Sequence, residues 1–125
     1  MSNKQITILV VEPCKRPYVK TIPHTLDELQ RVVGGAIEAI YPFFDNVALI
    51  CNEEGKLNGL ELNRALRDED DHIYDIIAGT FFIVGLSEDD FESLSVEMIQ
   101  KYSEYYARPE IFFNNDGKIV CIKDI

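Results

Sequence analysis

Carboxylates are the most abundant side chains in this sequence that could do chemistry. The 125-residue chain has 22 acidic residues against 12 lysines and arginines, so its formal net charge is -10. The segment from Glu53 to Glu97 holds thirteen acidic residues against three basic ones and therefore carries the whole excess. Two runs lie within it: Asp68, Glu69, Asp70 and Asp71, and then Glu88, Asp89 and Asp90. We expect both runs in exposed loops between apolar elements.

Neither acidic run has the spacing of a known metal-binding loop. An EF-hand calcium loop that began at Asp68 would place His72 at its fifth position and would end at Gly79, where a glutamate is required. The possible zinc ligands are too widely spaced for the paired pattern of zinc sites: Cys14, Cys51, Cys121, His24 and His72. We therefore expect no metal site and no other cofactor.

Motifs for nucleophilic or nucleotide chemistry are missing as well. The sequence has no Gly-x-Ser-x-Gly elbow and no phosphate-binding loop, and no cysteine and histidine lie closer in sequence than Cys14 and His24. Gly34 and Gly35 follow a helical pattern, whereas a phosphate site needs glycines that open a helix. Two carboxylates could act as acid and base only if one were removed from water. We therefore predict that the chain is not an enzyme.

The charge distribution favours a protein partner over nucleic acid or a membrane. A chain at -10 is repelled by phosphate, and its one basic stretch is the short segment Lys15–Lys20. No run of eighteen apolar residues occurs, and Met1–Ile8 lacks the apolar core of an export signal. Because three cysteines leave at least one thiol unpaired, a reducing cytoplasm is the expected location. The expected partner is a basic protein.

The elements that would position these side chains follow from hydrophobic periodicity and turn residues. Thr25 and Glu28 form a capping box at the start of a helix over Leu26–Val33, and Gly34 then supplies its left-handed stop. Two further helices are predicted, over Leu60–Leu66 and Val96–Tyr106. The predicted strands are short apolar runs: Ile6–Val11, Tyr18–Ile22, Ala36–Tyr41, Val47–Cys51, a pair within Ile73–Val84, and Lys118–Ile122.

Together these elements predict a single compact α+β domain over residues 1–125, mainly an antiparallel sheet of short strands with two or three helices. The best core candidates are the apolar run Ile73–Val84 and four phenylalanines: Phe81, Phe82, Phe112 and Phe113. Three tyrosines recur at helical spacing, Tyr102, Tyr105 and Tyr106. A core stripe is the favoured interpretation of these tyrosines, and a tyrosine-rich interface is the alternative.

Two long stretches carry specific sequence elements, Val10–Phe43 and Ala48–Leu86. They contain Val-Gly-Gly-x-Ile-Glu, Asn-Glu-Glu-Gly-Lys-Leu-Asn-Gly-Leu, Asn-Arg-Ala-Leu-Arg and Asp-Ile-Ile-Ala-Gly-Thr. In them the chain resembles an uncharacterised family, a domain of unknown function of phages and of plasmid-like or conjugative elements of gut Firmicutes. The resemblance implies a mobile-element context and carries over no catalytic residue. Small acidic proteins of such elements are often similar to anti-restriction and anti-CRISPR inhibitors of host defence.

Three hypotheses follow. The leading one is a non-enzymatic acidic binding protein of a mobile element that occupies the basic groove of a nucleic-acid-handling defence protein. Its expected contacts are the two acidic runs, gathered on one exposed face. The first alternative is a small-molecule or nucleotide-signal binding domain, with a pocket lined by Tyr18, Arg64, Arg67 and the Gly34–Gly35 turn. The second alternative is an accessory protein that acts through protein contacts only.

Overall fold

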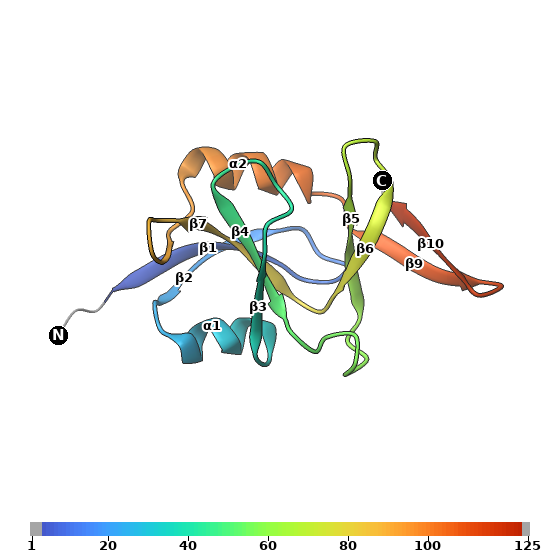
Figure 1. The fold of residues 1–125 in the computed structure, drawn as a ribbon, viewed down its shortest axis with the longest axis horizontal. Helices are drawn as coiled ribbons and strands as arrows, with labels where there is room; N and C mark the ends of the chain where they lie inside the picture. Colours follow the sequence, from blue (N-terminus) through green and yellow to red (C-terminus); the bar gives the residue numbers. More distant parts are fainter. Residues whose placement is uncertain (1–3, 124–125) are drawn as a thin grey trace.

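The structure is a computed structural model that describes residues 4–123 (Figure 1). Its fold is α+β and mainly antiparallel sheet, as the sequence predicts. In chain order the elements are β1 (Gln5–Val11), β2 (Tyr18–Pro23), α1 (Leu26–Val33), β3 (Ile37–Ile40), β4 (Val47–Asn52), β5 (Leu62–Arg67), β6 (Ile73–Ala78), β7 (Phe81–Leu86), β8 (Phe91–Glu92), α2 (Val96–Tyr105), β9 (Glu110–Asn115) and β10 (Lys118–Lys123). No helix within residues 4–123 is long and apolar enough to cross a membrane.

A central antiparallel sheet organises the chain, with strand order β2-β1-β7-β4-β3 and with β8 paired to the end of β7. Both faces of the sheet are covered, because α1 and α2 lie on opposite sides of it (Figure 1). Leu9, Leu49 and Ile83 point to the face that α2 covers, whereas Ile8, Ile50 and Phe82 point to the face that α1 covers. This two-sided burial explains why β4 and β7 read as continuous apolar runs instead of alternating patterns.

Two hairpins complete the fold, β5 with β6 and β9 with β10. The β5–β6 hairpin packs on the α2 side of the sheet, where Leu66 and Ile77 join the core that contains Tyr102 and Tyr106. The β9–β10 hairpin lies against β5 and extends away from the sheet (Figure 1). This arrangement brings the turn of the β5–β6 hairpin to the same side of the molecule as α2.

A buried polar pair attaches the β5–β6 hairpin to the rest of the protein. The Asn63 side chain donates to the backbone carbonyls of Val11 and Gly79, both at 2.9 Å. The Arg64 side chain is fully buried and donates to the carbonyls of Lys15 at 2.8 Å and Tyr106 at 2.9 Å, and to the Asn63 side-chain oxygen at 2.8 Å. The two residues therefore connect the β1–β2 loop, β5 and the end of α2.

The predicted helix over residues 60–66 is wrong, because this segment forms β5. Its leucine, arginine and alanine residues favour a helix locally, but pairing with β6 and the buried Asn63 and Arg64 bonds override that preference. The predicted pair of strands within residues 73–84 is confirmed, although β6 pairs with β5 and only β7 enters the central sheet. Phe81 and Phe82 are core residues as predicted, whereas Phe113 is 48% exposed on β9.

The strongest local predictions are confirmed. The predicted β1–β2 hairpin forms, with the two strands paired antiparallel. Thr25 Oγ1 accepts a hydrogen bond from the Glu28 amide at 3.2 Å, and Gly34 adopts a left-handed φ of 79° at the end of α1. Ser95 caps α2 in the same way, through the amide of Met98. These signals succeed because each is complete within a few consecutive residues.

Candidate functional site

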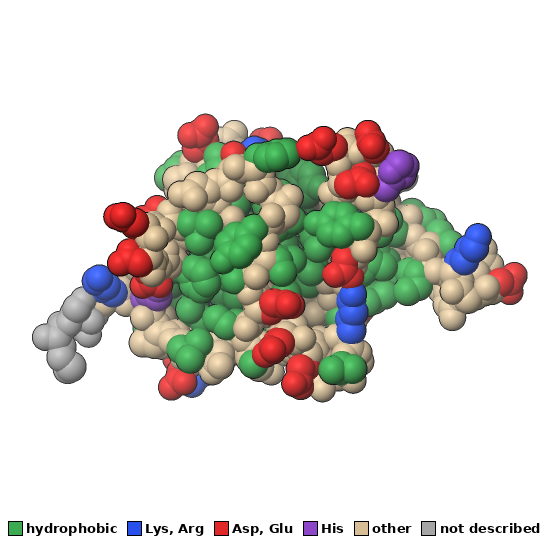
Figure 2. Space-filling model, viewed as in Figure 1, with side chains coloured by type: hydrophobic (Ala, Val, Ile, Leu, Met, Phe, Trp, Pro, Cys, Tyr) green, Lys and Arg blue, Asp and Glu red, His purple; other side chains and the backbone are tan. Residues whose placement is uncertain are grey.

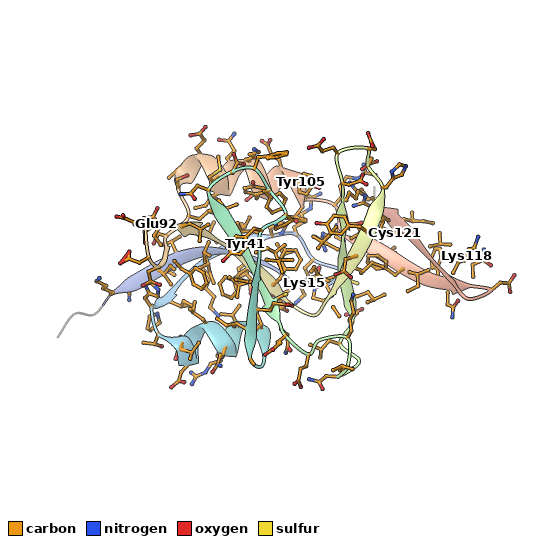
Figure 3. The ribbon with its side chains drawn as sticks, in the orientation of Figure 1. Lys15, Tyr41, Glu92, Tyr105, Lys118 and Cys121 are labelled. Atoms are coloured by element: carbon orange, nitrogen blue, oxygen red, sulfur yellow. The ribbon has the colours of Figure 1, made fainter. Side chains whose placement is uncertain are left out.

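An aromatic groove of about 990 Å³ lies between the β3–β4 loop, the β5–β6 turn and α2. Figure 2 shows apolar side chains at the centre of this face and carboxylates around its edge. In Figure 3, Tyr41 at the end of β3 and Tyr105 on α2 lie on this side. Six aromatic residues line the groove: Tyr41, Phe43, Phe44, Tyr74, Tyr102 and Tyr105. We call this hollow the aromatic groove.

The floor of the aromatic groove is a packed cluster of rings. The Phe43 ring lies 4.6 Å from that of Tyr102 and 5.9 Å from that of Tyr105, the second pair edge to face. Tyr105 in turn packs edge to face on Tyr106, with ring centroids 4.8 Å apart. Tyr102 and Tyr106 are buried and Tyr105 is half-exposed. The favoured interpretation of a core stripe is therefore confirmed for Tyr102 and Tyr106, whereas Tyr105 is half-exposed.

The loop that carries Phe44 is held in place by Asp45. The Asp45 carboxylate accepts a hydrogen bond from the Tyr102 hydroxyl at 2.6 Å and forms an ion pair with Lys101. These bonds from Lys101 and Tyr102 lower the pKa of Asp45, whereas burial and the bond to Asp45 raise the pKa of Tyr102. Phe44 beside it is 95% exposed. The groove thus presents a fully exposed phenylalanine from an anchored loop.

The anchoring of Asp45 should make stability depend on pH in acid. A carboxyl group whose folded pKa is below its unfolded value contributes stability at higher pH, and this contribution is lost as the pH falls through the folded pKa. We expect Asp45→Asn to unfold at lower urea concentration than the native chain at pH 7, with the difference shrinking below about pH 4. The exposed Glu88→Gln serves as the control and should show no such difference. An Asp45→Asn deficit that persists unchanged at pH 2.5 would contradict this assignment.

The charges around the aromatic groove do not cancel. Its two cations are already paired within the chain, Lys101 with Asp45 and Arg67 with the buried Glu110 at 2.8 Å. Three carboxylates at or near the rim have no side-chain hydrogen bond or ion pair in the part of the chain that the structure describes: Glu69, Asp70 and Glu104. The groove therefore presents unpaired negative charge beside exposed aromatic rings.

A second, smaller hollow continues this face beyond Tyr74. It has a volume of about 480 Å³ and lies between the β5–β6 and β9–β10 hairpins. Its apolar lining residues are Leu60, Leu62, Ile73, Tyr74, Ile76 and Ile119. Because Tyr74 lines both hollows, an occupant of the aromatic groove could extend an apolar side chain into this second one.

Comparison with known proteins assigns the chain to a family. A family model described as "Domain of unknown function (DUF3846)" matches residues 6–107. The chain belongs to this family. No curated protein and no solved structure matches it. The residues of the aromatic groove all lie within the matched part, whereas the β9–β10 hairpin lies beyond it. The groove is thus built from the part of the chain that the family model matches. The second hollow also includes Ile119, which lies outside the matched residues.

The structure separates the two acidic runs that the sequence predicts as contacts. Asp68, Glu69, Asp70 and Asp71 form the β5–β6 turn, and the first three line the aromatic groove. The run Glu88–Asp90 forms the β7–β8 turn at the opposite end of the molecule (Figure 1). All of these residues are exposed, as expected. They are not gathered in one place, however, because the β5–β6 turn lies near the C-terminal end of α2, whereas the β7–β8 turn lies before its N-terminal end (Figure 1).

Within the β5–β6 turn, Asp68 organises the backbone. Its carboxylate accepts hydrogen bonds from the amides of Asp70 and His72, both at 2.9 Å. The turn places one potential ligand atom from each of Asp68, Asp70 and His72 within 4.8 Å of the others. All three residues are exposed, and the grouping follows from the hydrogen bonds of the turn. Asp71 adopts a φ of 64° and lies 3.6 Å from Arg67.

The residues proposed for a small-ligand pocket do not come together. Arg67 lines the aromatic groove, but Tyr18 lies on edge strand β2 and lines none of the hollows described. Arg64 is fully buried, and its two terminal guanidinium nitrogens donate to backbone carbonyls and to Asn63, whereas its Nε has no partner among the described residues, so it is a structural residue. The Gly34–Gly35 turn ends α1 and packs closely on Asn52. These residues therefore lie in three separate places, on β2, on β5 and at the end of α1.

Sequence reasoning missed most of the aromatic groove. Its walls come from residues 41–45, 67–74 and 101–105, and only the topology brings these segments together. One signal was available in the sequence. Phe43 and Phe44 interrupt a predicted loop between two strands, where solvent-exposed polar residues are expected. Large apolar residues at such a position indicate either a buried loop or a binding surface.

Proposed function

We propose that this chain is a non-enzymatic binding protein whose aromatic groove receives a basic, partly apolar segment of a partner protein. The observation that supports this most strongly is the charge of the groove: both of its cations are paired, while Glu69, Asp70 and Glu104 have no side-chain partner within residues 4–123. A partner that supplies cations would satisfy these carboxylates. Phosphate or another anion would meet only repulsion there.

The aromatic residues suit a protein interface. Hot spots of protein interfaces are enriched in aromatic residues and arginine and lie in pockets that exclude water on binding. Phe44 and Tyr41 are exposed next to a packed floor, so covering them removes apolar surface from water. Because Asp45 already anchors the loop, little conformational entropy is lost when a partner binds. The groove is thus prepared for an occupant that brings apolar as well as basic side chains.

The charge of the chain and its resemblance to mobile-element proteins bear on the identity of the partner. We propose a nucleic-acid-handling protein of a host defence system, encountered in the cytoplasm and inhibited by a chain of mobile-element origin. Two features support it, namely the net charge of -10 and the resemblance to proteins of phages and conjugative elements. A protein that binds nucleic acid has a basic surface, and opposite net charges speed the encounter at low salt. The run Glu88–Asp90 contributes to this attraction at long range only.

Selection from a random peptide display library on the full chain tests the proposed function. We expect the enriched peptides to combine arginine or lysine with leucine, isoleucine, phenylalanine or similar residues, and to bind more weakly as salt rises. Purely apolar or acidic consensus sequences, or no enrichment at all, would refute it. A chain with Phe44→Ser and Tyr41→Ser, both exposed positions, should lose the enrichment if the groove is the binding site.

A further inference from the structure

We infer that the aromatic groove selects arginine over lysine in its partner. This inference rests on the proposed function and specifies the side chain that enters the groove. The guanidinium group is planar, carries five donors and is more weakly hydrated than an ammonium group. It can therefore lie flat on an aromatic ring and donate two parallel hydrogen bonds to a carboxylate at the same time.

The geometry of the groove offers both partners of such a side chain. Tyr105 packs edge to face with both Phe43 and Tyr106, and it is half-exposed among the residues that line the groove. Glu104 precedes it on α2, and Glu69 and Asp70 stand across the groove on the β5–β6 turn. Exposed aromatic surface thus lies between unpaired carboxylates on opposite walls. A lysine could satisfy one carboxylate but would gain less from the rings.

The two cations of the groove already pair with carboxylates of the chain. Arg67 donates to Glu110 at 2.8 Å, and its charge acts on the nearby Tyr105 hydroxyl. Lys101 lies 5.6 Å from the centre of the Tyr102 ring while it pairs with Asp45. Both internal cations therefore pair with a carboxylate, and Lys101 also lies over an aromatic ring. Glu69, Asp70 and Glu104 lie beside the aromatic rings of the same groove, but no cation of the described residues pairs with them.

Two synthetic peptides of equal length and charge test the selectivity, one alternating leucine with arginine and the other alternating leucine with lysine. Calorimetric titration of the full chain should show the arginine peptide binding about tenfold more tightly, which corresponds to about 1.4 kcal/mol. In Tyr105→Leu, which keeps apolar volume but removes the ring, we expect the ratio to fall below about threefold. Tyr18→Leu, a comparably exposed tyrosine on β2, should leave the ratio unchanged.

The outcomes separate this inference from the proposed function. Equal affinities for the two peptides would overturn arginine selection and leave a general basic groove. A preference that survives in Tyr105→Leu would overturn the stacking on which the inference depends. Binding of neither peptide, while a single-stranded oligonucleotide binds, would refute the proposed function itself. Circular dichroism of each variant establishes that it is folded before its affinity is compared.

Discussion

Arg64→Met is expected to lower the free energy of unfolding by about 3 kcal/mol. The substitution preserves an unbranched side chain but removes every donor from the backbone carbonyls of Lys15 and Tyr106 and from the side-chain oxygen of Asn63. Each buried acceptor left without a partner costs about 1–3 kcal/mol, and relief of the buried guanidinium charge offsets part of that cost. Urea denaturation followed by circular dichroism measures the difference.

Arg31→Met is the matched control for this experiment. The Arg31 side chain is mostly exposed on α1 and, among the residues that the structure describes, pairs with Glu28 alone, one turn away. Its loss should change the free energy of unfolding by about 0.5 kcal/mol or less. If Arg64→Met were as stable as Arg31→Met, the hydrogen bonds of Arg64 could not be what attaches the β5–β6 hairpin. Since that hairpin forms one wall of the aromatic groove, Arg64→Met should also weaken binding there.

Local signals were sufficient to predict several parts of the fold. The N-cap at Thr25, the stop at Gly34 and the run Ile6–Val11 each encode their structure in a few neighbouring residues, although the Glu28 carboxylate pairs with Arg31 and does not complete the predicted capping box. The strand β5 was not predictable in this way, because its leucines and arginines suit a helix. What makes it a strand is contact with β6 and with carbonyls up to 52 residues distant in sequence, as for Asn63 and Val11.

For the candidate site, too, features that depend on local sequence were predictable and features that depend on topology were not. The exposure of the acidic runs follows from their composition and was predictable. The separation of Asp68–Asp71 from Glu88–Asp90 was not, because it depends on which strands each turn connects. The groove is less predictable still, since its aromatic residues come from three segments that meet only through the packing of β5–β6 beside α2. Arg64 was predicted as a possible ligand contact, but it is buried and its hydrogen bonds attach β5 to the β1–β2 loop and to the end of α2.

Reversing the unpaired charges of the groove should abolish binding of a peptide enriched by display. We expect the triple variant Glu69→Lys, Asp70→Lys and Glu104→Lys to bind at least about a hundredfold more weakly, because each attractive contact becomes repulsive. All three positions are exposed, so the fold should tolerate the changes. Fluorescence anisotropy with a labelled peptide measures the affinity.

A second triple variant separates local contact from overall charge. Glu88→Lys, Asp89→Lys and Glu92→Lys change the net charge by the same amount at the opposite end of the molecule (Figure 1). This variant should slow association at low salt and change the affinity by less than about threefold at physiological salt. Equal losses in the two triple variants would mean that net charge, and not the groove, determines binding.

The most direct test of the aromatic groove is a nitrogen-15 NMR titration of the full chain with the enriched peptide. Binding in the groove predicts that the largest shift changes occur at the amides of Phe44, Asp70, Tyr74 and Tyr105. Changes centred instead on α1, on edge strand β2 or on the Glu88–Asp90 turn would place the peptide on another surface and contradict the assignment.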